Sequence, residues 1–144
     1  MEVVGINKGT DLLCEVPTPP SFLGAGAKRH FKEVGKRLIT AKILKAIHIT
    51  ALAVFAENLE QWEWAIKEIR AKNRKEKGSG YIQKFSTGAK NISVEITLKR
   101  DAEKAMMQCF KQFGIDPKSE KELKGIIDPD QGDLFEGFKN KKHG

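Results

Sequence analysis

The feature that most constrains the fold of this chain is an apolar stripe running through residues 46–75. Apolar side chains recur here at spacings of three and four, which places them on one face of an α-helix. They are Ile47, Ala51, Phe55, Leu59, Trp62, Ile66 and Ile69. A helix of this length extends about 45 Å at 1.5 Å per residue. One short helix cannot cover such a stripe, so we expect further helices to pack along it.

The flanking sequence supplies those helices. Residues 25–41 and residues 91–113 each carry an apolar stripe at helical spacing, and Asn91 is a suitable cap for the second. The β-branched start of that second segment also fits a strand. Gly114 ends it, and a short helix is predicted at 117–124, where proline occupies the first helical position.

Three glycines bracket the stretch YIQKF, which predicts a loop or short β-hairpin at 78–90. The predicted fold is therefore all-α, a helical bundle with one long helix hairpin. Residues 1–20 lack a clear period and end in VPTPP, so they are expected to form a poorly ordered arm. Residues 21–124 form the helical domain in this interpretation, and residues 125–144 form a flexible tail.

Positive charge is concentrated in residues 28–45, which contain seven cations and one carboxylate, a net +6 against +7 for the whole chain. On a helical projection, several of these cations gather within an arc of about 100°. A solvated helix surface is the simpler interpretation. Because only Glu33 offers local neutralisation, we favour a face that binds a polyanion such as DNA. The predicted phosphate-binding residues are Lys28, Arg29, Lys32, Lys36, Arg37, Lys42 and Lys45.

Trp64 lies about 160° around the long helix from Trp62, on its polar side. A large aromatic side chain there needs a second surface, supplied either by this chain or by a neighbouring subunit. We favour the subunit, and predict an oligomer interface at Phe55, Trp62, Trp64 and Ile66.

The tail has a different character from the rest of the chain. Residues 126–138 carry a net charge of −4 with interleaved apolar side chains. Such a segment does not build a core, but it can order on a partner's surface. A merely disordered tail is the simpler alternative. The side chains expected to dock on a partner are Leu134, Phe135 and Phe138.

No catalytic constellation, metal site or cofactor site is predicted. The three histidines are far apart in sequence, and the phosphate-loop pattern GxxxxGK[ST] does not occur. The longest apolar run, residues 49–56, is far shorter than the ~20 residues that span a bilayer, so no membrane partner is expected. No secretory signal opens the chain either.

With the helices placed, the chain resembles the small subunit of phage terminase, of the type found in tailed phages and prophages that cut at cohesive ends. The resemblance covers residues 19–124. It rests on PPSFLGAGAKRHFKEVGKRL, then ILKAIHITALAVFAENLEQWEWA, then GYIQ and finally FGIDPKSEKEL, in that order. The family often has glycine near Lys42, a Ser or Thr cap near Lys45 and Asp near His48. This chain departs from it there, so the first two helices are less clearly separated and can be read as continuous.

The resemblance implies a mainly α-helical protein that forms a ring of identical subunits in the host cytoplasm. It implies recognition of viral double-stranded DNA at the packaging site and transfer to the large terminase subunit, which holds the ATPase and nuclease. The protein itself would be a regulator without enzymatic activity. Two alternatives remain: a small helical dimeric DNA-binding transcriptional regulator, and a scaffold whose basic face meets an acidic protein.

Overall fold

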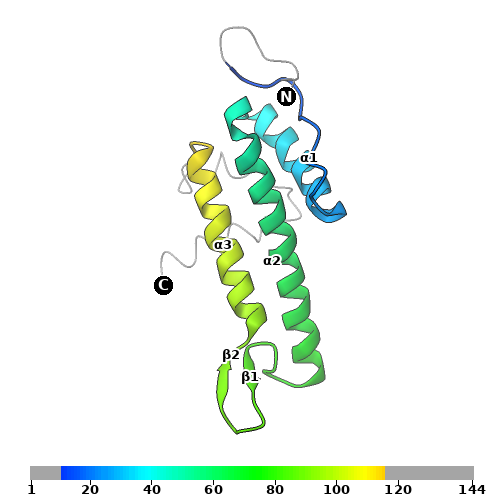
Figure 1. Ribbon diagram of the computed structural model, residues 1–144, viewed down its shortest axis with the longest axis vertical. Helices are drawn as coiled ribbons and strands as arrows, with labels where there is room; N and C mark the ends of the chain where they lie inside the picture. Colours follow the sequence, from blue (N-terminus) through cyan, green and yellow to red (C-terminus); the bar gives the residue numbers. More distant parts are fainter. Residues whose placement is uncertain (1–10, 116–144) are drawn as a thin grey trace.

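The computed structural model describes residues 11–115, which form a three-helix bundle with a small hairpin at one end (Figure 1). Along the chain the elements are α1 (Ala25–Thr40), the 3₁₀ helix η1 (Ala46–His48), α2 (Ile49–Lys75), β1 (Ile82–Lys84), β2 (Lys90–Ile92) and α3 (Val94–Gln112). The predicted all-α fold with a short hairpin is confirmed. The helix expected at 117–124 and the tail lie outside the described residues.

The long helix α2 is the centre of the bundle. α3 runs back along it, and Phe55 of α2 packs on Phe110 of α3 with ring centroids 5.2 Å apart. α1 covers only the first part of α2, on another side (Figure 1). Leu38, Leu52 and Met106, one from each helix, are fully buried in a single core. The apolar stripe of α2 is thus covered by two partner helices, as its length requires.

The corner between α1 and α2 is sharp, so the two helices do not run on. α1 ends at Thr40, and Lys42 adopts a left-handed backbone conformation with φ of 58°. Ile43 N then donates to Leu38 O at 2.9 Å, which closes the end of the helix. Position 45 has no Ser or Thr side chain to cap η1. The His48 side chain closes this turn instead, because its Nδ1 accepts a hydrogen bond from the backbone N–H of Lys45 at 3.1 Å.

Residues 11–20, here called the strap, differ from the expected poorly ordered arm. Leu13 is buried, and its N–H donates to Leu44 O at 2.9 Å. Val16 packs against α1 at Gly35, where a Cβ atom would lie only 2.7 Å from Val16 Cγ1. The strap is therefore part of the fold, and glycine at position 35 is what lets it approach α1 closely.

The hairpin pairs β1 with β2 in antiparallel register, with Ile82 opposite Ile92. This pairing uses the residues expected to start the third helix, so α3 begins at Val94 and its cap is Ser93 rather than Asn91. Ser93 Oγ accepts from Ile96 N at 3.2 Å and donates to Gly80 O at 2.7 Å. One buried serine thus starts α3 and anchors the base of the hairpin.

Candidate nucleic-acid interface

Four of the seven predicted phosphate-binding residues form a continuous surface on α1, here called the basic arc: Lys28, Arg29, Lys32 and Lys36. On a helical projection they span about 100°, on the side of α1 away from Phe31 and Leu38 in the core. Lys28 is half-buried and the other three are exposed. Within residues 11–115 none of the four forms an ion pair with a carboxylate. The basic arc therefore presents positive charge that this part of the chain does not neutralise.

The other three predicted residues are not brought into the basic arc. Arg37 is half-buried and lies about 80° beyond Arg29 around the helix. Lys42 is exposed at the corner after α1. Lys45 is half-buried and precedes η1. The sequence grouped all seven because they are close along the chain. Arg37 lies on another side of α1, and Lys42 and Lys45 follow the end of α1 at Thr40.

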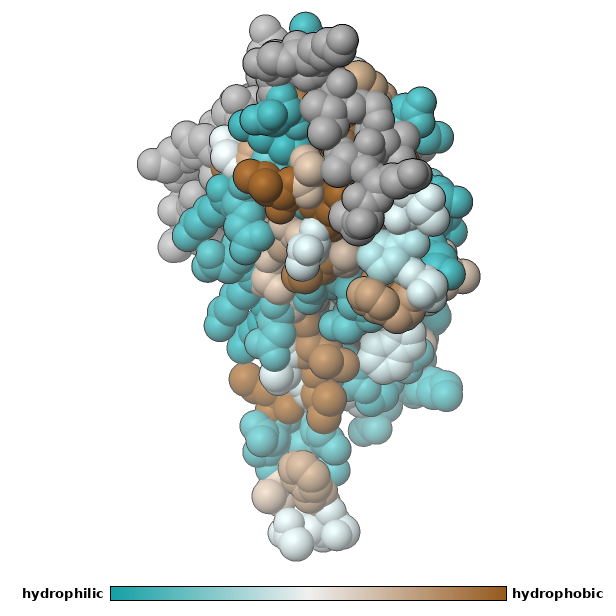
Figure 2. Space-filling view, turned by 45° about the horizontal axis from the view of Figure 1, so that its top comes forward, coloured by the Kyte–Doolittle hydropathy of each residue, from teal (hydrophilic) through white to brown (hydrophobic). Residues whose placement is uncertain are grey.

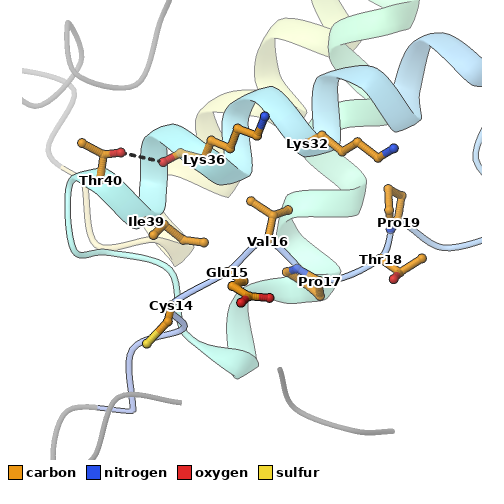
Figure 3. Close-up of a pocket in the computed structure, with 10 residues that line it drawn as sticks. All are labelled: Cys14, Glu15, Val16, Pro17, Thr18, Pro19, Lys32, Lys36, Ile39 and Thr40. Carbon is orange, nitrogen blue, oxygen red and sulfur yellow. Dashed lines mark hydrogen bonds between the residues drawn. The ribbon is translucent and has the colours of Figure 1, made fainter. Parts of the chain in front are cut away.

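The strap and α1 enclose an open groove of about 680 Å³ (Figure 3). Cys14 to Pro19 form one wall, and Lys32, Lys36, Ile39 and Thr40 form the other. In Figure 3 Val16 and Ile39 extend into the groove, while the two lysine side chains follow its α1 edge. Sequence reasoning missed this groove because the strap has no periodic pattern that would place it against α1.

Two buried histidines flank the α1–α2 contact without forming a metal site. His30 Nε2 lies 3.2 Å from Glu63 Oε1, although the two atoms are not aligned for a hydrogen bond. Burial, and then the nearby charge of Lys45, lower the pKa of His48. Across residues 11–115 no group of three His, Cys, Asp or Glu side chains is arranged to hold a metal ion.

The four predicted interface residues are in different environments. Phe55 is only 2% exposed, because it packs on Phe110 of the same chain, and this leaves it no surface for a second subunit. Trp62 is half-buried, and its Nε1 donates to Glu103 Oε1 at 3.1 Å. Ile66 is also half-buried. Trp64 is 50% exposed on the opposite side of α2, so it is the member of the set that offers a large apolar area to a partner.

A second apolar surface was not predicted from the sequence. Five large apolar side chains in or beside the hairpin are exposed: Tyr81, Ile82, Phe85, Ile92 and Val94. Figure 2 shows apolar residues along the narrow lower part of the molecule, where the hairpin lies in Figure 1. The alternation of YIQKF was a signal for a strand, but exposure on both faces of a two-stranded sheet is visible only in three dimensions.

The predicted docking residues Leu134, Phe135 and Phe138 lie outside the described residues.

The family model described as phage terminase, small subunit, matches residues 27–129. This match covers α1 from its third residue, together with α2 and α3, and leaves out the strap. Neither the curated proteins nor the solved structures gave a match. None of the described helices is both long enough and apolar enough to cross a bilayer.

Proposed function

The chain belongs to the phage terminase small subunit family, and we propose that it is the non-catalytic subunit that presents viral double-stranded DNA to a packaging motor in the host cytoplasm. In this proposal it binds the DNA, assembles with copies of itself into a ring, and recruits or regulates the large subunit that holds the ATPase and nuclease. The family match favours this role over that of a dimeric transcriptional regulator.

The observation that carries the DNA half is the basic arc. Lysine and arginine side chains that are not paired with carboxylates are the groups that neutralise DNA phosphates and release counterions. Lys32 and Lys36 are exposed one helical turn apart, so their ammonium groups are able to follow neighbouring phosphates. Contacts of this kind position a protein on DNA but do not read its sequence.

The observation that supports self-assembly is Trp64. An exposed tryptophan on the long helix is the type of residue that dominates protein interfaces. Val54 on α2 and Ile47 in the preceding η1 are also exposed and add apolar area. A head-to-tail contact through this surface closes into a ring when its rotation allows.

Recruitment of the large subunit is assigned to the tail residues Leu134, Phe135 and Phe138, on the basis of their apolar character among carboxylates.

DNA binding is tested by measuring the affinity for a labelled duplex across a salt series. Each neutralised phosphate contributes about −0.9 to the slope of log K against log salt. If both lysines contact phosphates, Lys32→Gln/Lys36→Gln should reduce the magnitude of that slope by about 1.8. The matched control is Lys104→Gln/Lys111→Gln, which removes the same charge from two exposed positions on α3.

An equal loss of slope in both double variants would show that total charge, and not the basic arc, drives binding. A salt-independent affinity in the unmodified protein would remove the DNA assignment altogether. Native mass spectrometry tests assembly separately. The expected result is a many-subunit species that Trp64→Ala converts to smaller ones, whereas a dimer would support the transcriptional regulator instead.

A further inference from the structure

We propose that the groove between the strap and α1 binds the acidic-aromatic tail of the same chain, residues 126–138, and that duplex DNA displaces it. Docking of the tail is independent of the proposed function. Displacement rests on the proposed DNA binding by the basic arc. In this arrangement the free protein covers part of its own DNA-binding surface.

The groove has the chemistry of a peptide-binding site. Its floor is formed by Val16 and Ile39, and its α1 edge by the aliphatic stems of Lys32 and Lys36 (Figure 3). Lysine side chains commonly bury their stems in this way and keep their charges at the rim. Glu15 on the strap wall adds one carboxylate, so the lining carries a net charge of +1 from Lys32, Lys36 and Glu15. A ligand for such a groove needs apolar side chains for the floor and carboxylates for the two ammonium groups.

The tail meets both requirements. Asp133 and Glu136 flank Leu134 and Phe135, and Phe138 follows. The carboxylates match the two lysines at the rim, which form no ion pair within the described part of the chain. The apolar side chains match the floor. A phosphate backbone would satisfy the lysines but would leave the apolar floor uncovered.

The described chain ends close to the groove. Phe113, at the end of α3, packs edge-on against His48 with ring centroids 5.6 Å apart. His48 accepts a hydrogen bond from Lys45, which forms a β-bridge with Leu12 of the strap. Residues 116–125, which precede the docked segment, would span up to about 35 Å when extended, whereas α1 is about 24 Å long. The tail of the same chain therefore reaches the groove without strain.

Displacement follows from the shared lysines. Lys32 and Lys36 belong to both the groove and the basic arc, so tail and DNA compete for them. An attached tail acts at a millimolar effective concentration, which favours it over weakly bound anions. A duplex engages the whole basic arc and releases counterions, and so displaces the tail. Displacement exposes Leu134, Phe135 and Phe138, which couples DNA binding to recruitment of the large subunit.

The direct test is zero-length carbodiimide cross-linking of the full-length protein, which joins carboxylates to amines in contact. We expect peptides that link Lys32 or Lys36 to Asp133 or Glu136, with a yield that falls as salt rises. Lys104 and Lys111 are the internal controls, because they are exposed amines on α3. Links from the tail to these controls with equal yield would overturn the proposal. Links between chains in a mixture of isotope-labelled and unlabelled protein would overturn docking within one chain.

A second test uses Cys14, which is exposed and lines the groove. Burial raises the pKa of Cys109 to about 11, so Cys14 is the thiol that reacts in the folded protein at neutral pH. We expect Phe135→Ala/Phe138→Ala to accelerate alkylation of Cys14 several-fold. The control Asn140→Ala, which lies beyond the docked segment, should leave the rate unchanged. Equal rates in the unmodified protein and the double variant would refute tail docking, whatever the result with DNA.

Adding a duplex to the unmodified protein separates the two halves of the proposal. Loss of the lysine-to-tail cross-links on DNA binding supports displacement. Retention of the cross-links in a protein that has bound DNA would overturn displacement. Cross-links in a protein that binds no DNA would confirm the docked tail and refute the proposed function instead.

Discussion

The contact between α2 and α3 and the outer face of α1 both carry lysines, but they use them in opposite ways. On the α2–α3 contact, Lys72 is bonded to Glu95, and Lys99 Nζ lies 2.7 Å from Glu103 Oε1. On α1, Lys32 and Lys36 have no carboxylate partner among the described residues. The difference indicates that one set of charges supports the fold and that the other is available for binding.

The same comparison holds for aromatic side chains. Trp62 faces α3 and donates to Glu103, whereas Trp64 is half exposed on the opposite side of the same helix. The two tryptophans, two positions apart in sequence, thus differ in role: Trp62 packs between helices and Trp64 lies at the surface. Substitutions at the α2–α3 contact should therefore change stability, and substitutions on the outer face of α1 should change binding.

The largest effect is expected at Phe110, which is fully buried and packs on Phe55. Phe110→Ala removes a large side chain and leaves a cavity, and should lower the free energy of unfolding by about 3–5 kcal/mol. Denaturant unfolding followed by circular dichroism measures the change. A loss below about 1 kcal/mol would mean that the α2–α3 contact is not the main source of stability.

A smaller effect is expected where the strap meets α1. Gly35→Ala gains helix propensity, but its Cβ would lie 2.7 Å from Val16 Cγ1, so the strap must shift. We expect a net loss of about 1–2 kcal/mol, typical of overpacking, with faster alkylation of Cys14 as the strap moves. Unchanged stability and an unchanged alkylation rate would show that the strap contributes little to the fold.

The ion pair at the end of α2 should contribute less, because the Lys72 side chain is 44% exposed. Glu95→Gln should cost about 1 kcal/mol at neutral pH. The hydrogen bond from Lys72 holds the pKa of Glu95 below its ordinary value of 4.5. Its stabilisation is therefore present above pH 4.5 and is lost as the pH falls through the lowered pKa. Unfolding measured from pH 7 to pH 3 should show the two proteins converging in acid, and a constant gap would contradict this cause.

The smallest effect on stability is expected in the basic arc. Lys32→Gln/Lys36→Gln should change the free energy of unfolding by less than about 0.5 kcal/mol, because ion pairs at exposed positions, such as those proposed with the tail, contribute little to stability. Thermal unfolding at low and high salt measures it. A clear stabilisation at low salt would show that these lysines repel one another in the free protein, and would argue against a tail that neutralises them.

Periodicity predicted the helices well because each buries one face over several turns. The stripe of α2 and the basic arc of α1 both follow directly from residue spacing. Phe55 shows the limit of this reasoning. The stripe predicts that Phe55 is covered, but it does not say whether the covering surface belongs to this chain or to another. Phe110, 55 residues further along, supplies it.

Contacts made by segments that have no repeating apolar pattern were not predicted, for a related reason. The strap is held by the hydrogen bond between Leu13 and Leu44 and by packing at Gly35, and neither leaves a repeating pattern in the sequence. The N-cap of α3 was predicted at Asn91 but lies at Ser93. Asn91 and Ser93 are both good helix caps, and the pairing of β2 with β1 decides between them.

The partial cover that α1 gives to α2 has a consequence for dynamics. α1 contacts α2 at Glu63, and nearer its end α2 is bonded to α3 through Lys72 and to the base of the hairpin through Asn73. Local opening costs least where the fewest apolar groups are buried. Amide hydrogen exchange should therefore quicken from the corner at Leu44 toward the hairpin. This gradient would allow one end of the protomer to adapt its shape to a neighbour while the other end stays rigid.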